Sequence, residues 1–424
     1  MATVEWIGNA KAVAQVTTVT ASAANSTEYS LTINGKEISY TSDGDATAAE
    51  ILLGLYEAWT DAAVVAGEYN ELTAELDDAE TPTVMTITGP VGLPFVLTSS
   101  GAGTLTVNDD IDATGPNHVS DVNNWSGGAL PSSSDTILIR TPVSLLYDLD
   151  ALAAIATSTF RVFASFWSGG ASIGLPKIHR VSNTLSYNEY RDRSLQLDGA
   201  TKVEIGQGID NGGQAIINLD FQTSNVDVTV YRSPKSNDLT RPAILITANP
   251  GAASGFPLEV LAGSVGVGFY GETCKVTPKI GHSGNVANDS NVILGTATTI
   301  GSTFDQSGGV VEISTATTAI AKTGGTLIIH GSGAHPVVDN QAGLLVYNSS
   351  GNIGGTSVKC GGGGTIDFSQ DMTSKTLSNA IQAYRGATII NPNGVVSGFA
   401  VKAMGCRLGE ITIVSPTDKT STPS

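Results

Sequence analysis

The sequence predicts a mainly β protein, in which a small N-terminal α+β domain precedes a Gly-rich β domain of β-helix-like or β-sandwich type. In the C-terminal half, short β-branched segments follow glycine stops, as in Gly308-Gly309 before Val310-Val311-Glu312-Ile313 and Gly324-Gly325 before Thr326-Leu327-Ile328-Ile329. Segments bounded by glycine and polar turns are typical of strands. Their unequal spacing, with no long helical pattern between them, favours stacked β coils over βαβ units.

The composition fits an ordered chain with an unusual surface. The 424 residues include 49 glycines, 14% charged residues and 6% aromatic residues, whereas 41% are hydrophobic. This hydrophobic content argues against disorder. So few charges predict faces that are covered by neighbours or coated with hydroxyl and amide groups.

The charge balance excludes some classes of partner. A net charge of −18 argues against direct nucleic-acid binding, which needs clustered Lys and Arg, and against anionic membrane surfaces. No apolar run is long enough to span a membrane, and residues 1–8 lack the pattern of a signal peptide. Cys274, Cys360 and Cys406 show no metal-site spacing, so we expect buried free thiols and assembly in a reducing cytoplasm.

Residues 1–10 are predicted to form a short arm, whose Trp6 docks either on its own domain or on a neighbour. Residues 11–113 are predicted to form the α+β domain. Here Asn34-Gly35 separates two alternating segments, residues 29–33 and 36–40, which is the strongest short hairpin signal. Thr47 and Glu50 have the spacing of a capping box, and the helix that follows places Ile51, Leu52, Leu55 and Trp59 on one face.

Further strands are expected at residues 71–76 and 84–88, with residues 91–97 and 104–107 closing the sheet. Residues 114–145 are predicted to be a junction, in which Trp125 covers the open end of the following core. Residues 146–405 are predicted to form the Gly-rich β domain, and residues 406–424 a C-terminal tail. Alternating patterns predict strands of this domain at residues 195–197, 202–205, 216–221, 226–231, 243–246 and 258–261.

Two stretches resemble a known group of proteins. The hairpin at residues 31–40, the helix at residues 46–59 and Gly92-Leu93-Pro94-Phe95 resemble a small domain of structural proteins from tailed phages and prophages. Residues 124–135, with Leu146-Tyr147-Asp148-Leu149-Asp150 and Ile173-Gly174-Leu175-Pro176, are similar to virion-associated β-rich proteins of that group. The resemblance covers roughly the first 180 residues. It implies a capsid decoration protein or a tail or fibre component that is often oligomeric and has no cofactor.

Several carboxylates are candidates for catalysis or metal binding. Glycoside cleavage needs two carboxylates at a set separation, and Glu204, Asp220 and Asp227 are candidates. Each lies in an alternating strand, so a solvated outward face is the favoured interpretation. Residues 108–112 concentrate oxygen ligands that calcium prefers, but they lack the twelve-residue calcium-loop pattern, which favours a loop turn.

Aromatic and arginine side chains provide the candidates for an interface, because such residues are enriched at protein–protein hot spots. Plain core filling is the alternative for the same side chains. The candidates are Trp6, Phe163, Phe166, Trp167, Tyr187, Tyr190, Arg191 and Arg193.

The function expected from the sequence is that of a non-enzymatic structural component of a phage virion, assembled in the host cytoplasm. Capsid decoration is preferred over a tail fibre because the chain is expected to be compact and lacks long fibrous repeats. The expected partners are the major capsid protein or other virion proteins and further copies of the chain, with a trimer favoured. A tailspike or adhesin that binds or cleaves host polysaccharide is the alternative, and a bacterial surface-layer or autotransporter-like protein is the third.

Overall fold

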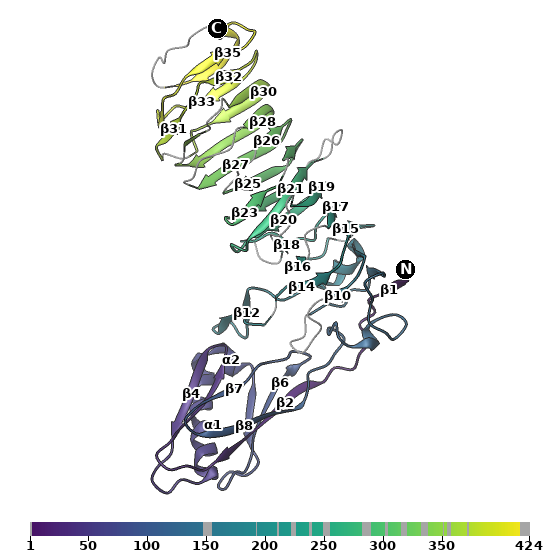
Figure 1. The fold of residues 1–424 in the computed structure, drawn as a ribbon, viewed down its shortest axis with the longest axis vertical. Helices are drawn as coiled ribbons and strands as arrows, with labels where there is room; N and C mark the ends of the chain where they lie inside the picture. The colour runs from purple at the N-terminus through teal and green to yellow at the C-terminus, as the bar shows by residue number, and fades with distance from the viewer. Residues whose placement is uncertain are drawn as a thin grey trace.

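The computed structural model describes residues 2–146, 155–191, 193–209, 212–221, 226–236, 240–248, 255–281, 290–301, 304–314, 320–331, 338–350, 352–353, 358–370 and 373–415. Residues 147–150 of the Leu146 to Asp150 motif and residues 416–424 of the expected tail lie outside the described residues. Strands dominate, which confirms the mainly β fold class. Figure 1 shows an elongated body with the α+β domain at one end and β35 at the other.

The α+β domain contains two antiparallel sheets and the helix α1 (Ala48–Val65). One sheet has the order β5–β6–β2–β8 and the other β4–β3–β7. These sheets and the helix share a hydrophobic core that is separate from the core of the remaining chain. The strands are β2 (Ala14–Ser22), β3 (Glu28–Ile33), β4 (Lys36–Thr41), β5 (Thr73–Leu76), β6 (Met85–Val91), β7 (Thr98–Gly101) and β8 (Thr104–Ile111), and a short helix α2 (Gly67–Asn70) follows α1.

Local sequence signals determine the hairpin and the helix of this domain. Asn34 and Gly35 have φ values of 52° and 68°, as a two-residue turn between β3 and β4 requires. Thr47 Oγ1 accepts a hydrogen bond from the Glu50 amide at 3.1 Å, and the Glu50 carboxylate accepts one from the Thr47 amide at 3.3 Å. The predicted capping box is therefore confirmed, and the predicted face of α1 is the buried one.

The prediction that residues 91–97 close the sheet is wrong beyond Val91, where β6 ends. The following residues include Gly92, with a φ of 74°, and Pro94, which has no amide proton to donate. Both features interrupt a β ladder. The second sheet is completed instead by β7, which pairs with β3.

The rest of the described chain is a parallel β-helix. Most strands pair in parallel with the strand two positions further along the chain, so that two ladders rise side by side. One ladder passes through β10, β14, β16, β18, β20, β22, β25, β27, β28, β30, β33 and β36, and the other through β1, β9, β11, β15, β17, β19, β21, β24, β26, β28, β30, β32 and β35. The long strands β28 and β30 belong to both ladders. This topology excludes the β-sandwich alternative.

The strands of the β-helix are β1 (Thr3–Glu5), β9 (Thr136–Ile139), β10 (Ile155–Ala156), β11 (Thr159–Phe163), β14 (Leu195–Asp198), β15 (Lys202–Gln207), β16 (Ile217–Phe221), β17 (Asp227–Val230), β18 (Ile244–Ala248), β19 (Phe256–Val260), β20 (Gly263–Val267), β21 (Cys274–Ile280), β22 (Ser290–Leu294), β23 (Thr298–Ile300), β24 (Asp305–Gln306), β25 (Val310–Ile313), β26 (Ile320–Lys322), β27 (Thr326–Gly331), β28 (Val338–Ser349), β29 (Asn352–Ile353), β30 (Lys359–Asp367), β31 (Lys375–Leu377), β32 (Ile381–Ala383), β33 (Thr388–Ile390), β34 (Val396–Ser397), β35 (Val401–Ala403) and β36 (Thr412–Val414). Two more strands, β12 (Ile178–Arg180) and β13 (Ser186–Asn188), form a separate antiparallel hairpin. Three 3₁₀ helices, η1 (Val122–Asn124), η2 (Ala164–Gly169) and η3 (Leu408–Glu410), lie in the connections.

Stacked aliphatic side chains fill the inside of the coils. One inward column runs in register through Leu195, Leu219, Ile246, Val267, Leu294, Ile313, Ile329 and Tyr347. All eight are almost completely buried within one cluster, which extends from Val4 to Ile411. Because the core is continuous, each coil is stabilised by the coils above and below it.

The α+β domain is inserted into the first coil of the β-helix. β1 pairs in parallel with β9, although the whole α+β domain lies between them in sequence. Residues 1–10 were expected to be an arm, but Thr3–Glu5 form a strand because Val4 and Trp6 are buried in the β-helix core. The rings of Trp6 and Trp125 pack edge to face with their centroids 5.0 Å apart, and both rings are buried in the β-helix core.

The repeated glycines form one corner of the coils. Gly309, Gly325 and Gly343 have φ values of 65°, 67° and 77° and occupy equivalent positions before β25, β27 and the second part of β28. A Cβ atom on Gly325 would collide with Gly309 O, and one on Gly343 with Gly325 O. Positive φ and close backbone stacking both require glycine here.

Buried polar side chains line the inside near this glycine corner. Gln306, Lys322, Asn340 and Cys360 follow one another in register and are each at most 1% exposed. Lys322 Nζ donates to Ala342 O at 2.7 Å, and Gln306 Nε2 donates to Thr326 O at 2.9 Å. These side chains satisfy inward-facing carbonyl groups that would otherwise be costly to bury.

Candidate functional site: a buried ionic junction between the two domains

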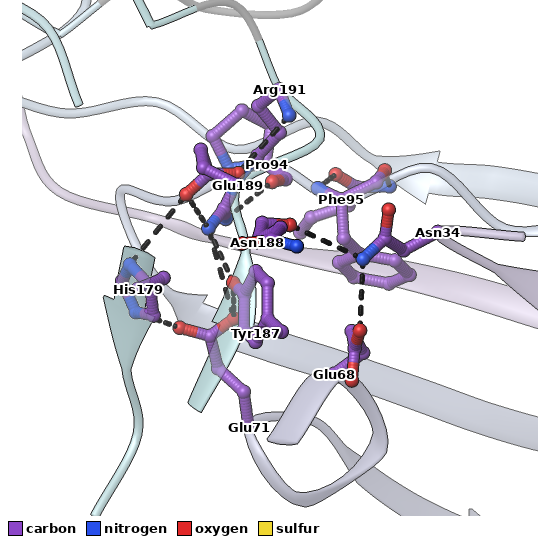
Figure 2. A network of polar contacts seen from close by, with 11 residues as sticks. Asn34, Glu68, Glu71, Pro94, Phe95, His179, Tyr187, Asn188, Glu189 and Arg191 are labelled. Atoms are coloured by element: carbon purple, nitrogen blue, oxygen red, sulfur yellow. Dashed lines mark hydrogen bonds and ion pairs between the residues drawn. The ribbon is translucent and has the colours of Figure 1, made fainter. Parts of the chain in front are cut away.

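A hairpin leaves the coils of the β-helix and reaches the α+β domain. It consists of β12 and β13, which pair antiparallel and lie between the two domains in Figure 1. β13 packs against α2, where Gly67 lies so close to Tyr187 that an added Cβ would be 3.2 Å from its ring. Figure 2 shows the polar network that joins the two sides.

Arg191 is the centre of this junction. Its guanidinium binds Glu189 through Nε at 2.7 Å and Nη2 at 2.9 Å, and both side chains are at most 1% exposed. Nη1 donates to the carbonyl of Pro94 in the α+β domain at 3.1 Å, and Nη2 also donates to Tyr187 Oη at 2.6 Å. A charged pair removed from water to this extent depends on complete hydrogen bonding.

Glu71 supplies the carboxylate from the α+β domain. Its oxygens accept from Tyr187 Oη at 2.6 Å and lie 2.7 Å from His179 Nε2. Burial alone would raise the pKa of Glu71, but the contacts with His179 and Tyr187 and the charge of Arg191 hold it below its ordinary value. The His179 ring stacks on Tyr187 at 5.1 Å, and His179 Nδ1 lies 3.6 Å from Glu189 Oε2.

A second set of contacts lies beside the first. Asn34, in the β3–β4 turn, donates to Glu68 Oε1 at 2.8 Å and to the carbonyl of Asn188 at 3.3 Å. Lys36 Nζ pairs with Glu68 Oε2 at 2.8 Å, and the Glu68 side chain is only 1% exposed. The hairpin turn thus has a second role, since it positions a contact to the β-helix.

The interface candidates proposed from sequence fall into two groups. Trp6, Phe166 and Trp167 are completely buried in the β-helix core. These three side chains therefore fill the core of a single chain, as the core-filling alternative expected, rather than a contact between subunits. Tyr187 and Arg191 form an interface, but it joins two domains of the same chain.

The remaining candidates are half-buried. Phe163 lies under the Arg140 guanidinium at 4.4 Å. Tyr190 packs against the core of the α+β domain, and burial raises its pKa to about 12. Arg193 lies 3.6 Å from Glu272 and 5.1 Å from the centre of the Tyr270 ring.

The candidate carboxylates do not share one environment. Glu204 was expected to be solvated but is 3% exposed, because Arg161 and Lys202 pair with it at 2.5 and 2.9 Å. Burial tends to raise its pKa, but hydrogen bonds from Lys202 and Arg161 keep it below the ordinary value. Asp227 is exposed, and Asp220 is half-buried on another ladder. Asp109 accepts hydrogen bonds from Thr17 and Gln15.

The described residues show neither a metal-binding cluster nor a membrane-spanning helix. No group of three or more His, Cys, Asp or Glu side chains is arranged there to hold a metal ion. No helix in this part of the chain is long and apolar enough to cross a membrane. Cys274 and Cys360 are buried free thiols, as predicted, and Cys406 is half-buried. Burial raises the pKa of Cys274 and of Cys360 to about 11.

Sequence reasoning missed Glu71, His179 and Glu189. The local signal was the segment Tyr187-Asn188-Glu189-Tyr190-Arg191. In a chain with few charged residues, it places a glutamate and an arginine two residues apart, next to two tyrosines. Their partner Glu71 is far away in sequence, and no local pattern connects it to them.

The fold defines a class of protein, namely a parallel β-helix with an α+β domain inserted in its first coil. Comparisons with protein-family models, curated proteins and solved structures find no match for this chain.

Proposed function

We propose that this chain is a non-enzymatic structural component of a phage virion that acts through contacts with other subunits. The observation that carries the proposal is the Arg191–Glu189–Glu71 junction, which fixes the α+β domain to a continuous β-helix core. We expect a body built in this way to be stiff, because each coil packs on its neighbours, and a stiff body suits a spacing role. The resemblance of the first 180 residues to virion proteins supplies the biological setting.

Capsid decoration is the first location proposed. The partners would be the major capsid protein or other virion proteins and two further copies of this chain. The large negative charge would keep such copies soluble before they assemble. A stable contact of this kind buries on the order of 1,200–2,000 Å².

Two measurements on the full chain test this proposal. Native mass spectrometry gives the oligomeric state, for which we expect a trimer. Immunogold labelling of purified particles gives the location, for which we expect labelled shells. A monomer that is absent from particles would contradict the proposal.

The tail is a second location, and the elongated body in Figure 1 favours it. The preference for decoration depended on a compact chain, whereas a long β-helix also suits a fibre or spike. Gold label at the tail would support this alternative. Release of oligosaccharides from host polysaccharide by the purified chain would contradict the non-enzymatic role at either location.

A further inference from the structure

One face of helix α1 is left uncovered by the described part of the chain. The opposite face packs into the core of the α+β domain, and Figure 1 shows α1 at the end of the molecule that lies away from β35. Glu57, Asp61 and Val64 follow one another at spacings of four and three residues, so they lie on one side of the helix. Val65 is next to them, and all four side chains are exposed. We call these four residues the outer α1 face.

Two valines form the apolar part of the outer α1 face. Val64 is 71% exposed and Val65 is 76% exposed. A single exposed aliphatic side chain is ordinary, but two adjacent ones on a helix, with charged residues beside them, form an apolar patch with a polar rim. Protein–protein contacts have this arrangement, in which polar groups surround an apolar centre.

The two carboxylates of this face are unfavourable for the helix on its own. Glu57 and Asp61 are four residues apart, where like charges repel each other. Asp61 also lies about one turn from the C-terminal end of α1, where the helix dipole disfavours an anion, and the last turn contains no basic residue. Neither carboxylate forms an ion pair with another described residue. A cation from outside the chain would relieve both kinds of repulsion.

The α+β domain as a whole is strongly acidic. Residues 11–113 contain 16 acidic residues and only 2 basic ones, Lys11 and Lys36. Lys36 is already paired with Glu68 in the junction. The field of the domain therefore attracts cations and repels anions. Two copies of the chain would repel each other if their outer α1 faces met, so a second copy does not fit this surface.

We propose that the outer α1 face binds a basic segment of a partner protein, in which lysine or arginine side chains flank an aliphatic one. The cationic groups would pair with Glu57 and Asp61, and the aliphatic side chain would cover Val64 and Val65. The inference goes beyond the proposed virion role and is independent of it, because it specifies the chemistry of the partner and not the particle in which the two proteins meet.

The test measures the binding of labelled peptides to the purified full chain by fluorescence anisotropy. The probe is a helical peptide of lysine and leucine in which the leucines lie on one side. Two comparators keep the same pattern, one with glutamate in place of lysine and one with serine in place of leucine. We expect the lysine–leucine peptide to bind saturably, and more weakly as salt is added. The lysine–serine peptide should bind at least about fivefold more weakly, and the glutamate–leucine peptide should not bind.

Variants of the chain locate the binding site. Glu57→Gln/Asp61→Asn removes both carboxylates of the face, and Val64→Ser removes one of its aliphatic side chains, so each should weaken binding of the lysine–leucine peptide roughly fivefold. Glu28→Gln/Asp112→Asn is the matched control, because it removes the same charge from two exposed positions of the domain outside α1. Its affinity should stay within about twofold of that of the unmodified chain. Circular dichroism verifies that all variants fold.

The stability of the free chain gives a second readout. Asp61→Asn should raise the midpoint of urea unfolding, because it relieves the repulsion of Asp61 from Glu57 and from the end of the helix. A carboxylate that served the fold of the domain would have the opposite effect.

Three results would overturn the inference. One is that the lysine–leucine peptide does not bind, or that the glutamate–leucine peptide binds equally well. Another is that Glu28→Gln/Asp112→Asn weakens binding as much as Glu57→Gln/Asp61→Asn, which would show an effect of the overall charge alone. The third is that Asp61→Asn lowers the midpoint of unfolding, which would show that Asp61 stabilises the helix.

Discussion

Arg191 Nε lies 2.7 Å from Glu189 Oε1, and both side chains are almost completely removed from solvent. The pair alone would be costly to bury, but Arg191 also donates to Pro94 O and Tyr187 Oη. The arginine therefore joins the β-helix to the α+β domain while it neutralises the buried glutamate. We therefore expect this pair to help hold the two domains in one relative position.

Arg191→Met should destabilise the chain strongly, because it leaves Glu189 buried without a counter-charge. Loss of one partner from a buried ion pair costs about 3–5 kcal/mol. Urea unfolding monitored by tryptophan fluorescence measures this loss. Arg385→Met is the matched control, since Arg385 is 76% exposed in its pair with Glu410, and it should cost under about 1 kcal/mol. Similar losses in both variants would show that the junction contributes little.

Acid should weaken the junction through Glu71. Its pKa is lower in the folded chain than its ordinary value of 4.5. The stabilisation from the charged carboxylate is therefore fully present above about pH 4.5 and is lost as the pH falls through the lowered pKa. The stability advantage of the unmodified chain over Glu71→Gln should shrink as the pH falls below about 4.5.

Thermal unfolding at a series of pH values measures this advantage. Glu75→Gln is the control, because Glu75 lies on the neighbouring strand β5 but is exposed. It should show little difference from the unmodified chain at any pH. A Glu71→Gln difference that stays unchanged down to pH 3 would contradict a charged Glu71 in the junction.

Local signals predicted most of the elements, and the long-range contacts escaped prediction. Asn34-Gly35 and the Thr47–Glu50 pair each act within a few residues, so the hairpin and the helix were found from sequence. The glycine stops predicted the β25 and β27 strands, because positive φ at the coil corner excludes other residues. The pairing of β1 with β9 and the contact of Glu71 with His179 depend on residues more than 100 positions apart, which no local pattern encodes.

Gly343→Ala should test the stacked corner. The added methyl group would meet Gly325 O and Lys322 Nζ, and alanine would be strained at a φ of 77°. Strain and overpacking together should cost about 2–4 kcal/mol. Gly405→Ala is the control, because Gly405 has a φ of 67° but no atom within 4 Å of an added Cβ. It should show the strain alone, about 1 kcal/mol, in the same urea unfolding experiment. Equal losses would mean that corner stacking is unimportant.

Lys322 should make stability depend on pH, because burial lowers its pKa from 10.5 to about 8. Between these values the unfolded chain holds one proton more than the folded chain, so the free energy of unfolding rises with pH. The penalty of burying the charge is constant below pH 8 and disappears above pH 10.5. Lys322→Met removes this titration, and its stability relative to the unmodified chain should fall by about 1 kcal/mol from pH 8 to 9.

Urea unfolding between pH 7 and 9 gives this difference. Cys360 acts in the opposite direction near pH 9, because burial raises its pKa from 9.0 to about 11, but it is present in both proteins and its effect cancels in the comparison. Lys322→Met also loses the hydrogen bond to Ala342 O. The cost of this loss varies little with pH, so it lowers the stability of the variant without changing how the stability difference depends on pH. Lys402→Met, on the outward side of β35, should leave the pH profile of the unmodified chain intact. If Lys322→Met also runs parallel to the unmodified chain, the Lys322 ammonium is as stable in the core as in water.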